Sequence, residues 1–174
     1  MTCQVSMIFA SDSQHAIGFQ NGLPWNSCPE DMEWFKQNTM GKTVVMGRLT
    51  YESLPERFRP LPGRTNVVLT SNTETFIDAI VSPSVEAVLE RFKDEEEIVV
   101  IGGGEVYKSF APYITKVYQS NIPYTHDTDI TMEVECEDWD LVYHDSRLGE
   151  DKPSFQIFEK MGVNDELVID VRKY

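Results

Sequence analysis

An aspartate stands among aromatic residues in the segment PEDMEWFKQNT at positions 29–39. If this segment is a helix, Asp31 shares one face with Trp34 and Phe35, because residues three and four positions apart are neighbours on a helix. An acidic residue in the first helical turn also interacts favourably with the helix dipole. Glu30 and Glu33, on a polar face, already supply that interaction. A carboxylate beside aromatic rings could bind a cationic or amidine-like group and pass protons, with a pKa that burial raises.

Two other segments place glycine between a predicted strand and a helix start, VVMGRLT at 44–50 and VVIGGGE at 99–105. Glycine lets the backbone approach a phosphate closely, and a helix start offers unpaired N–H groups. Arg48 adds a permanent charge and Thr50 adds a hydroxyl. Taken singly, each segment is explained as well by a tight turn, and Arg48 by a solvated surface charge. Together they predict a site for a ligand with several phosphates.

A third candidate is Arg64, which follows a Pro-Gly turn in LPGR at 61–64. Such a turn can hold a guanidinium rigidly for a bidentate contact with a carboxylate, although any surface strand could also begin with an arginine. The histidines, His15, His126 and His144, lie far apart and offer no metal-ligand spacing. We therefore predict no metal site.

The elements that must position these residues alternate between strand and helix. We expect strands at 3–10, 43–46 and 65–70, a long loop over 11–27, and a strand followed by glycines and a helix over 97–110. We expect helices over 29–40 with a Ser27/Glu30 capping box, from Thr50 onward, and over 85–92. Beyond Tyr113 the segments ITKVYQSNI, DWDLVYHD and SFQIFEKM read as strands without intervening helices, so we expect the C-terminal part to add antiparallel strands to the sheet. The fold class is α/β, a single-domain mixed, mostly parallel twisted sheet with helices on both faces.

Composition fits one globular domain of 174 residues. The 15 Lys and Arg against 29 Asp and Glu give a net charge of -14, which disfavours nucleic acids and anionic membranes as partners. Three widely spaced cysteines predict neither a disulfide framework nor a zinc site. Without a targeting or membrane-spanning segment in the sequence, we expect a cytoplasmic protein.

Four stretches, NGLPWNSCPEDMEWFKQNT, VVMGRLTYESL, LPGRTNVVLTS and VVIGGGEVYKSF, occur in an order and spacing that resemble the dihydrofolate reductase family. The resemblance extends from the first strand to about Met161. It implies an enzyme that uses NADPH to reduce dihydrofolate to tetrahydrofolate. We expect the protein to be a monomer. Residues 1–162 would form the dihydrofolate reductase-like domain. Residues 163–174 would form a C-terminal extension of unknown role, either an edge strand or a loose tail.

The resemblance also implies roles for individual residues. Asp31 would grip the amidine edge of the pterin and support protonation of N5, with Ser120 hydrogen-bonded to it and with Trp25 in a mobile loop over the nicotinamide. The other substrate-binding residues implied are Ile8, Met32, Phe35, Leu54, Leu61, Arg64 and Ile101. The cofactor-binding residues implied are Ala10, Ile17, Leu23, Gly47, Arg48, Leu49, Thr50, Thr70, Ser71, Gly102, Gly103, Gly104, Glu105, Val106 and Tyr107.

One departure from the family pattern concerns Glu105, which stands where several relatives carry an arginine near the cofactor phosphates. Two alternatives remain open. One is the pyrimidine reductase of riboflavin synthesis, which shares the fold and cofactor, although Asp31, Phe35 and Arg64 together argue against it. The other is a non-catalytic module that binds NADPH and folate without turnover.

Overall fold

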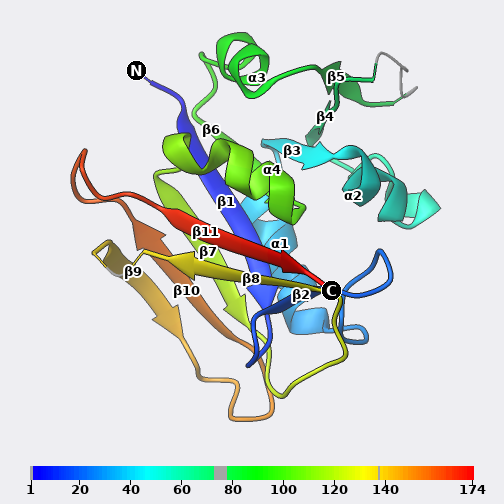
Figure 1. The fold of residues 1–174 in the computed structure, drawn as a ribbon, viewed down its shortest axis with the longest axis vertical. Helices are drawn as coiled ribbons and strands as arrows, with labels where there is room; N and C mark the ends of the chain where they lie inside the picture. The colour runs from blue at the N-terminus through cyan, green and yellow to red at the C-terminus, as the bar shows by residue number, and fades with distance from the viewer. Residues whose placement is uncertain (1, 73–77, 137) are drawn as a thin grey trace.

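The computed structural model describes residues 2–72, 78–136 and 138–174. Within that part of the chain an eight-stranded sheet has the order β5-β4-β3-β6-β1-β7-β10-β9 (Figure 1). The six strands from β5 to β7 in this order are parallel, and β10 and β9 are antiparallel additions at one edge. Their bounds are β1 Gln4–Ser11, β3 Thr43–Gly47, β4 Thr65–Leu69, β5 Ile80–Ser82, β6 Glu97–Gly102, β7 Lys116–Asn121, β9 Asp140–Asp145 and β10 Ser154–Glu159. This arrangement confirms the predicted fold class.

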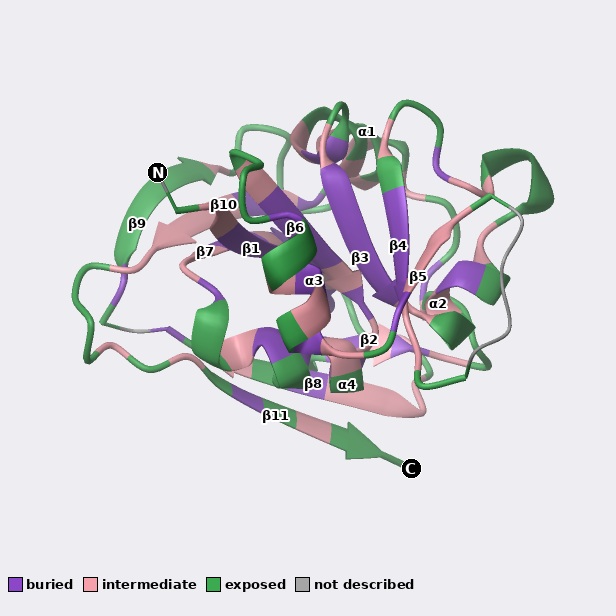
Figure 2. Ribbon diagram, turned by 90° about the horizontal axis from the view of Figure 1, so that it is seen from above, coloured by how far each residue is buried: buried purple, intermediate pink, exposed green. Residues whose placement is uncertain are grey.

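Alternation along the central strands divides the interior into two cores, because successive side chains in a strand point to opposite faces. Met7 and Phe9 of β1 pack in the core beneath α3 (Val85–Arg91) and α4 (Gly104–Phe110). Ile8 packs in the other core, beneath α1 (Pro29–Thr39) and α2 (Arg48–Ser53). The central strands are buried along most of their length, whereas the edge strand β9 is largely exposed (Figure 2).

A second, smaller sheet has the order β11-β8-β2, with bounds Val168–Lys173, Ile130–Glu135 and Ala16–Gly18. Both β11 and β2 pair antiparallel with β8. Figure 1 looks onto the face that carries this sheet and α4, with α1 on the far side. The last dozen residues therefore contain an edge strand, which resolves the alternative of a loose tail.

Several predicted boundaries were wrong. Helix α1 is capped by Cys28, whose backbone is extended, so Ser27 stands one position too early for the predicted capping box. Helix α2 starts at Arg48 rather than at Thr50. The stretch 11–27 is interrupted by β2, and neither β5 nor β8 was predicted. Short 3-10 turns cover Glu56–Phe58 and Ala111–Tyr113, and no helix among the described residues is long and apolar enough to cross a membrane.

Candidate active site

Asp31 lies in the first turn of α1, half-buried, with its carboxylate in a hydrogen bond with the hydroxyl of Ser120. Ser120 is fully buried on β7, the strand beside β1. Burial raises the pKa of Asp31, and the hydrogen bond from Ser120 opposes that rise only in part. The sequence predicted that Asp31 lies beside aromatic rings. In the structure its charged form is poorly solvated, so its carboxyl holds a proton more tightly than a solvated aspartate does.

Tyr107 joins Asp31 from the opposite side of the sheet. Its hydroxyl donates a 2.6 Å hydrogen bond to the backbone carbonyl of Ile8. Burial raises the pKa of Tyr107, and the nearby charge of Asp31 raises it further, so the phenol stays protonated at neutral pH. Sequence reasoning gave Tyr107 only as a cofactor contact. Its hydrogen bond to Ile8 joins residues 99 positions apart in the sequence, so no local sequence pattern could predict it.

The two glycine turns lie side by side, as expected for neighbouring parallel strands. A Cβ on Gly102 or Gly103 would stand 3.7 or 3.6 Å from Thr50 Oγ1, which belongs to the other turn. A Cβ on Gly47 would stand 3.0 Å from Val106 Cγ2, so a side chain there would press against α4. The carboxyl ends of β3 and β6 thus bring both predicted phosphate-binding segments together. The Gly102–Gly103 peptide bond is cis.

These turns suit a phosphate-bearing cofactor such as NADPH. Gly47 is the N-cap of α2, and Gly103 is the N-cap of α4. Within the described part of the chain, no side chain forms a capping hydrogen bond at either helix start. Backbone N–H groups at both helix starts therefore remain available to an anion. The exposed guanidinium of Arg48 lies 4.0 Å from Glu52, a loose surface pair that leaves Arg48 free to turn toward a phosphate.

Arg64 lies near the other end of α1. Its Nη1 donates to Thr39 Oγ1 at 3.0 Å, its Nε donates to the carbonyl of Pro62 at 2.9 Å, and its guanidinium stands 5.9 Å from the centre of the Phe35 ring. Thr39 is eight residues beyond Asp31, which corresponds to about 12 Å along a helix axis. Asp31 at the start of α1 and Arg64 at its end therefore place an acidic and a basic group apart by about the length of a small elongated molecule.

The turn that carries Arg64 is held by Asn66, a residue that sequence reasoning missed. The Asn66 side chain accepts from the backbone N–H of Leu61 at 2.9 Å and donates to the carbonyls of Leu61 and Arg64 at 3.0 and 3.1 Å. Asn66 is buried, so these bonds are shielded from water. An asparagine at the second position of a strand gives no sequence signal for this role.

Trp25 is buried, with its ring edge toward His126 at a centroid distance of 5.8 Å. The buried carboxylate of Asp12 accepts the backbone N–H of His126 at 2.8 Å and lies 3.1 Å from its Nδ1. Sequence reasoning found nothing functional in His126. The structure shows that it connects the end of β1 to the loop that carries Trp25.

The remaining predicted residues fall into two groups. Ala10, Ile17, Leu54, Ile101, Val106 and Thr70 are half-buried, and Thr70 directly follows Leu69, which pairs with Gly47. Leu23, Met32, Leu49, Ser71 and Glu105 are exposed. The exposed apolar side chains Leu23, Met32 and Leu49 are ones that a bound ligand could cover.

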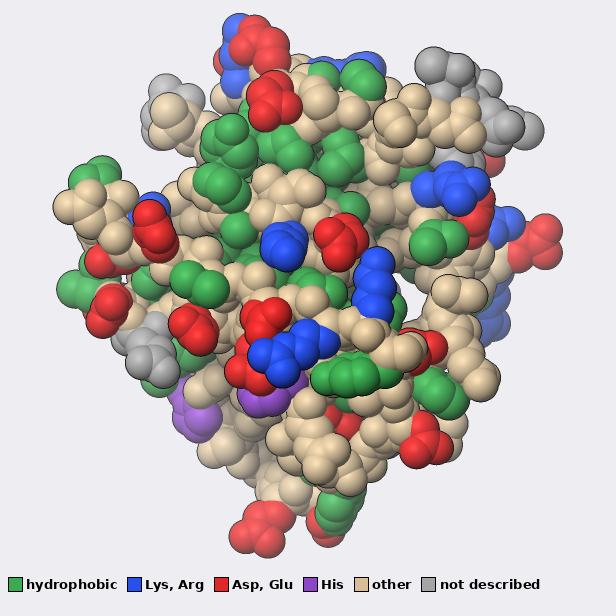
Figure 3. Space-filling view, viewed as in Figure 1, with side chains coloured by type: hydrophobic (Ala, Val, Ile, Leu, Met, Phe, Trp, Pro, Cys, Tyr) green, Lys and Arg blue, Asp and Glu red, His purple; other side chains and the backbone are tan. Residues whose placement is uncertain are grey.

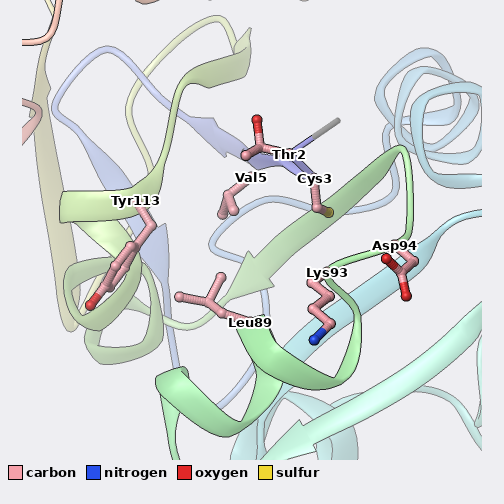
Figure 4. Close-up of a pocket in the computed structure, with 7 residues that line it drawn as sticks. All are labelled: Thr2, Cys3, Val5, Leu89, Lys93, Asp94 and Tyr113. Atoms are coloured by element: carbon pink, nitrogen blue, oxygen red, sulfur yellow. The ribbon is translucent and has the colours of Figure 1, made fainter.

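A surface pocket of about 440 Å³ lies at the amino end of β1, away from all of these residues (Figure 4). It is lined by Thr2, Cys3, Val5, Leu89, Lys93, Asp94 and Tyr113. Apart from Arg64, which directly precedes β4, the candidate site gathers at the carboxyl ends of β1, β3 and β6, where ligands bind in open α/β sheets. This pocket is therefore separate from the candidate site.

Known proteins resemble the chain over most of its length. A family model for dihydrofolate reductase matches residues 4–160. The dihydrofolate reductase of Haemophilus influenzae is 36% identical over 148 residues, covering 84% of this chain and 90% of that protein. The Bacillus subtilis enzyme of the same name is 35% identical over 162 residues, covering 90% and 94%. The solved structure of dihydrofolate reductase from Enterococcus faecalis complexed with NADP(H) superposes with a TM-score of 0.79 at 31% identity, covering 91% of this chain and 97% of that chain. The chain therefore belongs to the dihydrofolate reductase family.

Proposed function

We propose that this protein reduces 7,8-dihydrofolate to 5,6,7,8-tetrahydrofolate with NADPH. The observation that carries the proposal is a pair of anchors along α1. The half-buried carboxylate of Asp31 lies at the start of this helix, and the guanidinium of Arg64, from the turn before β4, contacts Thr39 at its end. Dihydrofolate has a pterin with an amidine edge at one end and a glutamate carboxylate at the other, which matches this order of charges. NADPH supplies the hydride.

Asp31 is the group that supports protonation of the substrate. Burial raises the pKa of its carboxyl, so the side chain holds a proton nearer to neutral pH than a solvated aspartate does. The Ser120 hydroxyl fixes the orientation of the carboxylate. Ile8 offers its carbonyl oxygen to the pterin amine with its remaining lone pair, because Tyr107 already occupies the other.

Dihydrofolate is further held by apolar side chains around α1. Phe35 lies beneath the guanidinium of Arg64, and Phe35 and Leu54 pack against the core that contains Ile8. Met32, Leu61 and Ile101 complete the proposed substrate contacts. Arg64 stays charged although burial lowers its pKa, since guanidinium groups in proteins do not deprotonate near neutral pH.

The cofactor lies along the two glycine turns. Backbone N–H groups at Gly47–Thr50 and Gly102–Gly104 bind its phosphates, with Arg48 and Ser71 beside the 2′-phosphate. Ala10, Ile17, Leu23, Leu49, Thr70, Val106 and Tyr107 line the rest of its path, with Glu105 at the pyrophosphate end. Trp25 and its neighbours exclude water from the nicotinamide.

The direct test mixes the purified chain with NADPH and dihydrofolate and follows the loss of reduced-nicotinamide absorbance. We expect turnover that depends on both reagents. Binding of both ligands without turnover would support the non-catalytic module. Turnover of the deaminated pyrimidine intermediate of riboflavin synthesis, without turnover of dihydrofolate, would support the pyrimidine reductase.

We further propose that the enzyme acts as a monomer in the cytoplasm, with residues 1–162 as its catalytic domain. The net charge of -14 supports the expectation that neither nucleic acid nor an anionic membrane is a partner. Size-exclusion chromatography with light scattering would test the monomer.

A further inference from the structure

The C-terminal strand β11 lies beyond residue 160, the last residue that the family model matches. All six of its residues pair with β8, from Val168 opposite Glu135 to Lys173 opposite Ile130. Ile169 is buried in the core beneath α4, and Val171 packs against the same core. The segment is therefore built into the fold.

Val171 meets the start of α4 at Gly104. A Cβ on Gly104 would stand 2.7 Å from Val171 Cγ1 and 3.2 Å from Val171 Cγ2, a distance at which something must shift. The backbone of Gly104 does not adopt a positive φ, so an alanine would fit its conformation. Contact with β11 is therefore a sufficient reason for glycine at position 104.

The same turn connects directly to the proposed phosphate contacts. Gly104 follows Gly103, whose carbonyl accepts the backbone N–H of Tyr107 at 3.0 Å in the first turn of α4. Any shift of Gly104 away from Val171 therefore moves Gly103 and Gly102 with it. Farther along β11, Lys173 Nζ lies 3.8 Å from Glu105 Oε1, an exposed pair that adds little energy of its own.

The residue that follows β11, Tyr174, is connected to the loop that carries Trp25. The backbone N–H of Tyr174 donates to the carbonyl of Asp129 at 2.9 Å, and the Asp129 carboxylate accepts the backbone N–H of Gln20 at 2.9 Å. On its other side, β8 pairs with Ala16 and Gly18 of β2. Strand β11 thus contacts the glycine turn directly, and the residue that follows it is linked to the loop that carries Trp25 through Asp129.

We propose that β11 is a positioning element for NADPH, with Val171 as the residue that sets the place of the Gly102–Gly104 turn. This inference rests on the proposed cofactor site and assigns a role to residues 163–174. Val171 touches no ligand and acts through Gly104. Most of the proposed dihydrofolate contacts lie around α1, on the other face of the sheet, and only Ile8 and Ile101 lie close to the Gly102–Gly104 turn. We therefore expect β11 to affect NADPH binding more than dihydrofolate binding.

The test is a double-mutant cycle between Gly104→Ala and Val171→Ala, read as the Kd of NADPH and of dihydrofolate by calorimetry. Residues in contact couple by amounts that correspond to about two- to 100-fold in Kd. We expect Gly104→Ala to weaken NADPH binding by about tenfold and to change the Kd of dihydrofolate by less than about threefold. Adding Val171→Ala removes both Cγ atoms that clash, and we expect it to restore the Kd of NADPH to within about threefold of wild type.

A matched control is Val168→Ala, which changes the exposed valine of the same strand. We expect it to give no rescue of Gly104→Ala. The inference is overturned if the double variant binds NADPH as weakly as Gly104→Ala alone, or if Gly104→Ala binds it as wild type does. A parallel loss of dihydrofolate affinity also overturns it, because that pattern indicates general loss of structure.

The cycle also separates the inference from the proposed function. If the wild-type chain turns over dihydrofolate but Val171→Ala gives no rescue, the inference alone fails. If the wild-type chain does not bind NADPH, the cofactor site fails and the inference falls with it.

Discussion

At the scale of single residues, Asp31 carries two opposed properties. Its carboxyl has a raised pKa because burial disfavours the charged form, and at neutral pH that same burial makes the charged form costly to the fold. Such a cost is common at functional sites, where a group tuned for chemistry is poorly placed for stability.

The first prediction concerns this stability cost. Because folding raises the pKa of Asp31, the folded state holds a proton that the unfolded chain releases above about pH 3.9. The ionised carboxylate therefore lowers the free energy of unfolding at neutral pH, and this effect disappears at pH values below both pKa values. We expect Asp31→Asn to raise the Tm at pH 7.5 and to lose that advantage as the pH approaches 4, as measured by calorimetry.

Asp12→Asn is the contrasting control. Burial alone would raise the pKa of Asp12, but hydrogen bonds from the backbone of Ala16 and Gln14 and from His126 together lower it. Its ionised form stabilises the fold above its unfolded pKa, so Asp12→Asn should lower the Tm at pH 7.5. A lowered Tm for Asp31→Asn at that pH would contradict the desolvation argument.

The second prediction concerns Arg64. Charge-assisted bonds to a carboxylate contribute about 1.5–3 kcal/mol, which corresponds to about 10- to 100-fold in binding. We expect Arg64→Ala to raise the KM for dihydrofolate by this factor with little change in the KM for NADPH. Arg57→Ala, at an exposed position nearby, serves as the control in the same steady-state measurement. Equal KM values for wild type and Arg64→Ala would remove Arg64 from the substrate site.

At the scale of elements, the sequence predicted best where one periodicity dominates. The strands at 43–46 and 65–70 were predicted because both of their faces are buried, which gives continuous apolar runs. Strands β2 and β5 have three residues each, too few to show a period. Strand β8 pairs with a segment about 40 positions later, a relation that local sequence does not show.

The residues of the candidate site also divide into those that local sequence patterns predict and those that only the structure shows. Asp31 and the glycine turns could be predicted because helix spacing and strand–glycine–helix order are local signals. The contacts of Asn66 within its turn and of Tyr107 with Ile8 depend on side-chain placement in the folded chain. Their roles became visible only with the structure.

The third prediction concerns the turn that holds Arg64. Asn66→Ala leaves the buried N–H and carbonyl of Leu61 without their partner, which costs about 1–3 kcal/mol. We expect a lower free energy of unfolding in urea and a raised KM for dihydrofolate. Thr65→Ala changes the exposed residue before it and should alter neither value. A destabilised Asn66→Ala with an unchanged KM would show that the turn does not position Arg64.

At the scale of the whole molecule, charge opposes the proposed ligands. The protein carries -14, while NADPH and dihydrofolate are both anions. Asp and Glu side chains are spread over much of the face that carries α4 and β11, with Lys and Arg among them (Figure 3). The positive groups at the site must therefore act locally, against a repulsive long-range field.

The fourth prediction follows from this field. Salt shortens the Debye length from about 30 Å at 0.01 M to about 10 Å at 0.1 M, which screens distant charges more than close contacts. We expect the association rate of NADPH, measured by stopped flow, to rise about two- to tenfold over this range. A rate that falls steadily with added salt would show that local attraction controls the encounter.

The central claim is that Asp31 supports the proton that dihydrofolate needs, and the pH dependence of hydride transfer in Asp31→Asn tests it most directly. Without the carboxyl, the proton must come from solvent. The single-turnover rate should then be lower than that of wild type by orders of magnitude at pH 7 and should rise about tenfold per unit as the pH falls. NADPH binding should be unchanged. A near-normal rate at pH 7 that does not vary with pH would contradict the claim.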